Sequence, residues 1–143
     1  MRTAFGDTSY WVALLDPNDQ WHETAKATRE ALGDSRIVTT DEVLGEVLTF
    51  LASLGPRLRG SAVRFARGIL HDPRVEVLPQ TRDSFLAGLG LYEERPDKEY
   101  SLTDCISMAT MWRRGLSEVL TNDCHFTQEQ FAILMRAEAG EGG

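Results

Sequence analysis

The chain has 143 residues and a mass of 16.0 kDa, the size of one domain, and its 42% hydrophobic and 26% charged residues exclude wholesale disorder. No apolar run approaches the roughly 20 residues of a membrane-spanning helix, and Asp7 comes too early for a signal peptide, so a cytoplasmic protein without membrane contact is expected. The net charge of −7 argues against a protein that coats nucleic acid, but it does not exclude a nuclease, because carboxylates around a divalent cation also make a chain acidic.

Short apolar runs alternate with longer stretches of helical periodicity along the chain. Strands are predicted over 3–5, 37–39, 75–78 and 119–121, with a weaker one over 132–135. Helices are predicted over 9–15, 21–32, 43–54, 62–70, 85–92 and 106–112. This order predicts an α/β fold with three layers, α/β/α, around a central, mostly parallel sheet. We expect one domain over 1–136 and a disordered tail over 137–143.

Two acidic residues directly follow predicted strands, and two more lie in predicted helices. Asp7 follows the first strand and Asp123 the fourth, and ligands of open parallel sheets bind beyond the carboxyl ends of the strands. Glu46 and Asp104 lie at the margins of apolar helix faces, where a carboxylate is costly unless a positive charge meets it. Two ionised carboxylates about 4 Å apart repel by about 4 kcal/mol at an effective dielectric constant near 20. The four acids therefore predict a site for Mg²⁺ or Mn²⁺.

Each acid also has a structural interpretation. A helix cap would explain Asp7, a turn would explain Asp123, and Asp104 has the spacing from Ser101 of a capping box. Glu42 is an alternative to Glu46 as the glutamate of the metal site. The spacing Thr39-x-x-Glu42 predicts a capping box, however, so a structural role suffices for Glu42.

The segments that carry the four acids follow one another in a characteristic order. They are Asp7-Thr8-Ser9, then Glu46, then Ser101-Leu102-Thr103-Asp104-Cys105, and lastly Thr121-Asn122-Asp123-Cys124-His125-Phe126. In this order the sequence resembles the PIN-domain nucleases, and in particular the VapC-type toxins of bacterial toxin–antitoxin modules, from Thr3 to about Met135. The resemblance implies a PIN-like α/β/α fold. It also implies a Mg²⁺-dependent endoribonuclease, with Mn²⁺ as a substitute, that hydrolyses phosphodiester bonds in RNA.

The resemblance also implies roles for individual residues and partners. The acids match the quartet that carries catalysis and holds the metal: Asp7, Glu46, Asp104 and Asp123. Supporting polar positions are matched by Thr8, Ser101, Thr103 and Asn122. A VapB-like antitoxin that covers the cleft and a homodimer are implied as well. Gly6 departs from the family pattern, which has a bulkier residue there, and we expect it to loosen the end of the first strand.

Positive charges gather outside these motifs. Arg57, Arg59 and Arg64 fall near or within one predicted helix, where they form either a solvated face or a surface that follows RNA phosphates. Lys98 precedes the third acid by six residues and is a candidate for contact with the scissile phosphate.

Other functions fit the sequence less well or share its motifs. A PIN-type nuclease of RNA maturation or turnover would have the same acids, whereas the complete quartet argues against a non-catalytic PIN-like binding module. A phosphoacceptor receiver domain would need an aspartate after the third strand, where Leu78-Pro79-Gln80 stands, and a lysine after the fifth. A zinc site of Cys105, Cys124 and His125 lacks the usual ligand spacing.

Overall fold

The computed structural model describes residues 2–136, so the predicted tail over 137–143 lies outside the described residues. Five strands form one sheet in the order β3-β2-β1-β4-β5, and every pairing is parallel. Their bounds are Thr3–Gly6 for β1, Arg36–Thr40 for β2, Val75–Leu78 for β3, Glu118–Leu120 for β4 and Ala132–Ile133 for β5. The predicted parallel α/β fold is therefore confirmed.

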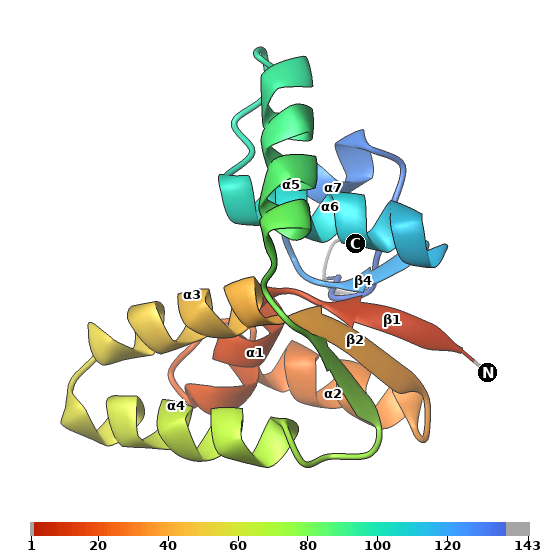
Figure 1. Cartoon of the computed structure of the whole chain (residues 1–143). Helices are drawn as coiled ribbons and strands as arrows, with labels where there is room; N and C mark the ends of the chain where they lie inside the picture. The colour runs from red at the N-terminus through yellow and green to blue at the C-terminus, as the bar shows by residue number, and fades with distance from the viewer. Residues whose placement is uncertain (1, 137–143) are drawn as a thin grey trace.

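Helices cover both faces of the sheet. They are α1 (Thr8–Leu15), α2 (His22–Leu32), α3 (Asp41–Ala52), α4 (Pro56–Ile69), α5 (Arg82–Glu94), α6 (Leu102–Arg114) and α7 (His125–Gln128). Figure 1 shows α1 to α4 on one side of the sheet and α6 and α7 on the other, with α5 standing out as an arm beside α6. The predicted three layers are thus present. Within residues 2–136, no helix has both the length and the apolar character needed to cross a membrane.

Side-chain caps start several of these helices. Thr81 is the N-cap of α5, where its side chain accepts a hydrogen bond from the Ser84 backbone N–H at 2.9 Å and completes a capping box. The capping box predicted for Thr39 and Glu42 is wrong. Thr40 is the N-cap of α3 and accepts from the backbone N–H of Val43 at 3.1 Å, whereas the Thr39 hydroxyl donates to the Gly6 carbonyl at 2.8 Å.

Gly6 makes room for an aromatic ring at the end of β1. A methyl group on Gly6 would lie 2.8 Å from the Cζ2 atom of Trp11, which is too close for real carbon atoms. The Gly6 carbonyl accepts hydrogen bonds from Trp11 Nε1 at 3.3 Å and from Thr39 Oγ1 at 2.8 Å. The expectation that Gly6 loosens this strand end is therefore wrong, because the strand end is held by two side chains.

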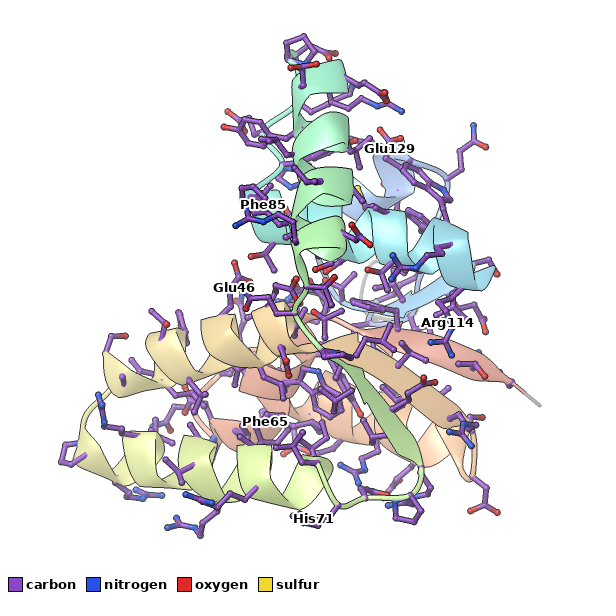
Figure 2. All side chains as sticks on the ribbon, in the orientation of Figure 1. Glu46, Phe65, His71, Phe85, Arg114 and Glu129 are labelled. Carbon is purple, nitrogen blue, oxygen red and sulfur yellow. The ribbon has the colours of Figure 1, made fainter. Side chains whose placement is uncertain are left out.

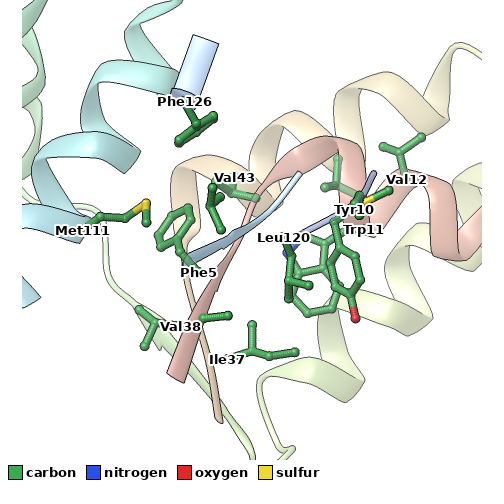
Figure 3. Packing of buried hydrophobic residues seen from close by; sticks show 14 of the residues in the cluster. Phe5, Tyr10, Trp11, Val12, Ile37, Val38, Val43, Met111, Leu120 and Phe126 are labelled. Atoms are coloured by element: carbon green, nitrogen blue, oxygen red, sulfur yellow. The ribbon is translucent and has the colours of Figure 1, made fainter. Parts of the chain in front are cut away.

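The core surrounds the three central strands. Phe5, Val38 and Leu120 are each at most 1% exposed, and Figure 3 shows residues from both helical layers gathered around them. From the α6 and α7 side come Met111 and Phe126, which are fully buried. Burial of one such side chain contributes roughly 1.5–3 kcal/mol, so these contacts fix both helical layers to the strands whose ends hold the polar residues.

The order of the strands places a binding site at the centre of the sheet. The chain adds β2 and β3 on one side of β1 and then β4 and β5 on the other. Gly6 pairs with Leu120 across β1 and β4, and the Asp7 N–H donates to the Leu120 carbonyl at 3.1 Å. The residues that follow β1 and β4 therefore leave the sheet side by side, at the switch point where ligands bind in such folds.

Candidate active site

A cleft of about 560 Å³ opens at this switch point, and all four predicted acids line it. Asp7 comes from the end of β1, Asp123 from the segment after β4, Glu46 from α3 and Asp104 from the first turn of α6. In Figure 2, Glu46 lies on the side of α3 that faces α5 and α6. Residues separated by more than 100 positions in sequence are thus brought together by the fold.

Asp7 is the most deeply buried of these acids. Only 4% of its surface is exposed. It occupies the N-cap position of α1, but its side chain makes no capping hydrogen bond, so capping does not explain it. Removal from water, and then repulsion by Asp104, raise the pKa of Asp7 to about 7, although a hydrogen bond from Thr121 opposes the shift. A group with this pKa is poised to lose its proton when a cation arrives.

Two hydroxyl groups hold Asp7 in place. Thr121 Oγ1 donates to Asp7 Oδ2 at 2.8 Å, and it also accepts from the Asp123 backbone N–H at 3.0 Å. Ser9 Oγ lies 2.9 Å from Thr121 Oγ1 and accepts from the Asn122 N–H at 3.3 Å. Because Thr121 has a single proton and gives it to Asp7, the Ser9 hydroxyl must be the donor to Thr121. This chain ties the ends of β1 and β4 together.

Asp104 both caps a helix and contributes a carboxylate to the cleft. It completes the predicted capping box: its backbone N–H donates to Ser101 Oγ at 3.0 Å, and its Oδ2 accepts from the Ser101 N–H at 3.2 Å. The same carboxylate lines the cleft. Burial is the main cause that raises the pKa of Asp104, and the nearby Asp123 adds to it. The cap therefore fixes the carboxylate that faces the other acids.

Glu46 is tied to the first helix by a hydrogen bond. Thr8 Oγ1 donates to Glu46 Oε1 at 2.6 Å, across the start of α1 and the middle of α3. Thr8 was predicted as a supporting residue, and this contact shows how it positions the glutamate. Ser101 and Asn122 also line the cleft, whereas Thr103 is not among the residues that line it.

His125 lies beside two of the acids, although the sequence suggested it only as a zinc ligand with Cys105 and Cys124, an interpretation that was set aside. Its Nδ1 is 3.4 Å from Asp123 Oδ1 and 3.5 Å from Asp104 Oδ2. One ligand atom from each of these three residues lies within 4.8 Å of the other two. The available signal was its position two residues after Asp123, because a tight turn brings such a residue back toward the acid. That turn is present, since the His125 N–H donates to Asp123 Oδ1 at 2.9 Å.

The donor groups of the cleft suit a hard divalent cation. Carboxylate and hydroxyl oxygens converge there, and none of the residues that line the cleft in the described part of the chain is Lys or Arg. Lysine and arginine side chains of the described residues therefore do not neutralise the acids. Carboxylates crowded in this way either take up protons, as the raised pKa of Asp7 shows, or share a cation.

Comparison with known proteins now identifies the fold family. A family model described as the PIN domain matches residues 4–131. The chain belongs to the PIN domain family. It is 32% identical over 131 residues to the 23S rRNA-specific endonuclease VapC20 of Mycobacterium tuberculosis, covering 89% of this chain and 94% of that protein.

Solved structures agree with this assignment. The crystal structure of VapC20, described as a sarcin-ricin loop cleaving toxin, matches with a TM-score of 0.82 and 28% identity over 93% of this chain and 99% of its own. FitAcB from Neisseria gonorrhoeae matches with a TM-score of 0.65 and 18% identity over 92% of this chain and 96% of its own, which shows a shared fold. The PIN-like architecture predicted from the sequence is therefore confirmed.

The predicted cationic residues lie away from the acidic cleft of this PIN domain. Lys98 Nζ is 3.5 Å from Asp97, and Lys98 lines a separate cavity of about 90 Å³. Arg57, Arg59 and Arg64 lie on α4, which carries four arginines and no acid. None of these side chains lines the acidic cleft, so any contact they make with RNA is at a distance from the acids.

Proposed function

We propose that this chain is a metal-dependent endoribonuclease that acts as the toxin of a type II toxin–antitoxin module. The observation that carries the proposal is the convergence of four acids in one cleft at the switch point of the sheet. Membership of the PIN family and the similarity to VapC20 support the same activity.

The acids divide the work of the site. Asp7, Asp104 and Asp123 are proposed to hold the cation and Glu46 to complete the catalytic quartet, with Thr8 and Ser101 as the groups that position two of them. When bound, the cation supplies positive charge that makes a water molecule a better nucleophile and stabilises the leaving oxygen. Asn122 lines the cleft and is proposed as a supporting polar group, while Thr103 has no contact here that supports such a role.

Mg²⁺ is the proposed physiological ion, with Mn²⁺ as a substitute. Oxygen donors dominate the cleft, and Mg²⁺ binds through one or two carboxylates while it keeps several waters. Asp7, Asp104 and Asp123 would hold such an ion, which would supply the polarised water for hydrolysis.

The proposed substrate is ribosomal RNA of the large subunit. VapC20 is named for cleavage of 23S rRNA, and the similarity extends over nearly all of both chains. Phe50 lines the cleft with 49% of its surface exposed, which suits it to stack on a base of a single-stranded loop. The arginines of α4 are proposed to contact phosphates farther along the RNA.

Two protein partners are also proposed. An antitoxin of the VapB type is proposed to cover the acidic cleft. A second copy of the chain would cover apolar side chains of the α5 arm, where Leu86, Leu89 and Tyr92 are 42–53% exposed.

A cleavage assay with purified ribosomes and total RNA tests the enzymatic proposal. Wild type should produce discrete new RNA ends in Mg²⁺, EDTA should stop cleavage, and added Mg²⁺ or Mn²⁺ should restore it. Asp7→Asn should abolish cleavage, whereas Asp34→Asn, at an exposed loop position outside the cleft, should retain it. Cleavage that survives EDTA, or an Asp7→Asn variant as active as wild type, would refute the proposal.

A further inference from the structure

The imidazole of His125 has the spacing of a metal ligand. Around an octahedral ion with bonds of about 2.1 Å, neighbouring ligand atoms lie about 3 Å apart and opposite ones about 4 Å apart. His125 Nδ1 is 3.4 Å from Asp123 Oδ1 and 3.5 Å from Asp104 Oδ2, and the three ligand atoms lie within 4.8 Å of one another. Small side-chain adjustments would let all three reach one ion.

The same nitrogen has no other partner within the described residues. His125 Nδ1 is buried and has no hydrogen-bond partner among the described residues, although two carboxylate oxygens lie 3.4 and 3.5 Å away. A buried polar atom left unpaired destabilises the folded protein. A cation between the imidazole and the two acids would remove that destabilisation, since Nδ1 carries a lone pair when the proton is on Nε2.

Neighbouring residues fix the ring in this position. The His125 backbone is anchored by its N–H bond to Asp123, and its ring packs on Tyr100 with the ring centroids 5.3 Å apart. Tyr100 is in turn held by its hydroxyl, which donates to Glu129 Oε2 at 2.8 Å, and Arg95 binds the same carboxylate at 3.0 Å. A ring held this way loses little freedom when it binds an ion.

We propose that His125 Nδ1 is a direct ligand of the divalent cation, beside Asp104 and Asp123, and that this mixed donor set binds Mn²⁺ more tightly than Mg²⁺. The inference rests on the proposed function, because it requires a cation among the acids. Mg²⁺ strongly prefers oxygen, whereas first-row transition ions such as Mn²⁺ accept an imidazole nitrogen. Mg²⁺ then still binds through the oxygen ligands, but the histidine strengthens Mg²⁺ binding less than it strengthens Mn²⁺ binding.

Electron spin-echo spectroscopy of Mn²⁺ bound to the untagged, full-length protein tests the proposal directly. In a buffer free of nitrogen, the wild-type spectrum should show the hyperfine coupling of a coordinated nitrogen. The coupling should disappear in His125→Gln and persist in His71→Gln, whose imidazole is exposed near the end of α4 and bonds the Arg67 carbonyl. By calorimetry, His125→Gln should weaken Mn²⁺ binding at least about tenfold and Mg²⁺ binding less.

The outcomes separate this inference from the proposed function. Mn²⁺ that binds wild type without nitrogen coupling, or coupling that survives in His125→Gln, overturns the role of the histidine and leaves the metal-dependent nuclease intact. Failure of wild type to bind Mn²⁺ at all overturns both. The wild-type spectrum is decisive on its own, so a His125→Gln variant that folds poorly does not weaken the test.

Discussion

Replacing Asp7 by asparagine should stabilise the metal-free protein at alkaline pH while it destroys the proposed site. The carboxylate is almost completely buried, and its nearest polar partner is a neutral hydroxyl rather than a base. Asparagine has the same shape and no charge, and its side-chain oxygen can still accept the hydrogen bond from Thr121. The variant therefore removes the charge and leaves the packing unchanged.

The size of the effect follows from the pKa of Asp7. A rise from 3.8 to about 7 corresponds to about 4 kcal/mol, since a tenfold change in proton affinity is 1.36 kcal/mol. Between these pH values the folded state keeps a proton that the unfolded chain has released. The stability of the wild type must therefore fall as pH rises from about 4 to about 7, and stay lower above that. The stability of the asparagine variant should not show this decrease over the same pH range.

Urea denaturation in EDTA measures the free energy of unfolding of both proteins at about pH 5 and about pH 8. Asp7→Asn should be the more stable protein at the higher pH, by up to about 4 kcal/mol, and the gap should narrow at the lower pH. Mg²⁺ should raise the stability of the wild type at about pH 8 much more than that of the variant. Asp34→Asn serves as the control and should follow the wild type. If Asp7→Asn is equally stable or less stable than wild type at about pH 8 without metal, the buried charge of Asp7 does not destabilise the folded protein.

Two further predictions concern packing and the hydroxyl network. In thermal unfolding, Gly88→Ala should destabilise the protein by about 1–3 kcal/mol, because the new methyl group would lie 3.1 Å from the Ile106 backbone nitrogen. The control Gly90→Ala should be neutral or stabilising, because nothing lies within 4 Å of the new methyl group there. Thr121→Val removes a hydrogen bond that lowers the pKa of Asp7, so protons should compete better with Mn²⁺ for the Asp7 carboxylate. Calorimetry near pH 7 should therefore show weaker Mn²⁺ binding to Thr121→Val, whereas Thr121→Ser should bind Mn²⁺ like wild type.

Much of the fold was predictable because short apolar runs are bounded by residues that end strands. The strand predicted over 75–78 has the bounds found for β3, since Pro79 cannot continue the ladder. The strand predicted over 119–121 is shifted by one residue relative to β4, which ends at Leu120. Thr121 lies just past the end of β4, and its hydroxyl binds Asp7, a contact that no local pattern could show.

The acids of the site were predictable because parallel strands bring their carboxyl ends to one edge. That rule selected Asp7 and Asp123, the resemblance to the PIN-domain nucleases selected them again, and both line the cleft. The hydroxyl network was not predictable in the same way. Thr121 and Asp7 are 114 residues apart, and their contact depends on the register of β1 with β4. His125 was missed for a related reason, since only the turn after β4 and the start of α6 bring its ring to Asp104.

The charge balance of the cleft shows why the folded chain needs a cation from outside. Within residues 2–136 no lysine or arginine lines the cleft, although the chain has 15 such residues, and Lys98 and the arginines of α4 lie elsewhere. A buried charge without a partner typically costs several kcal/mol, and Asp7 avoids that cost only below about pH 7, where it holds a proton. A protein stabilised by its own ion pairs would have placed a lysine or arginine beside Asp7. The position is instead left for an ion that can carry water to a phosphate, so the feature that weakens the metal-free fold is the one that the proposed chemistry requires.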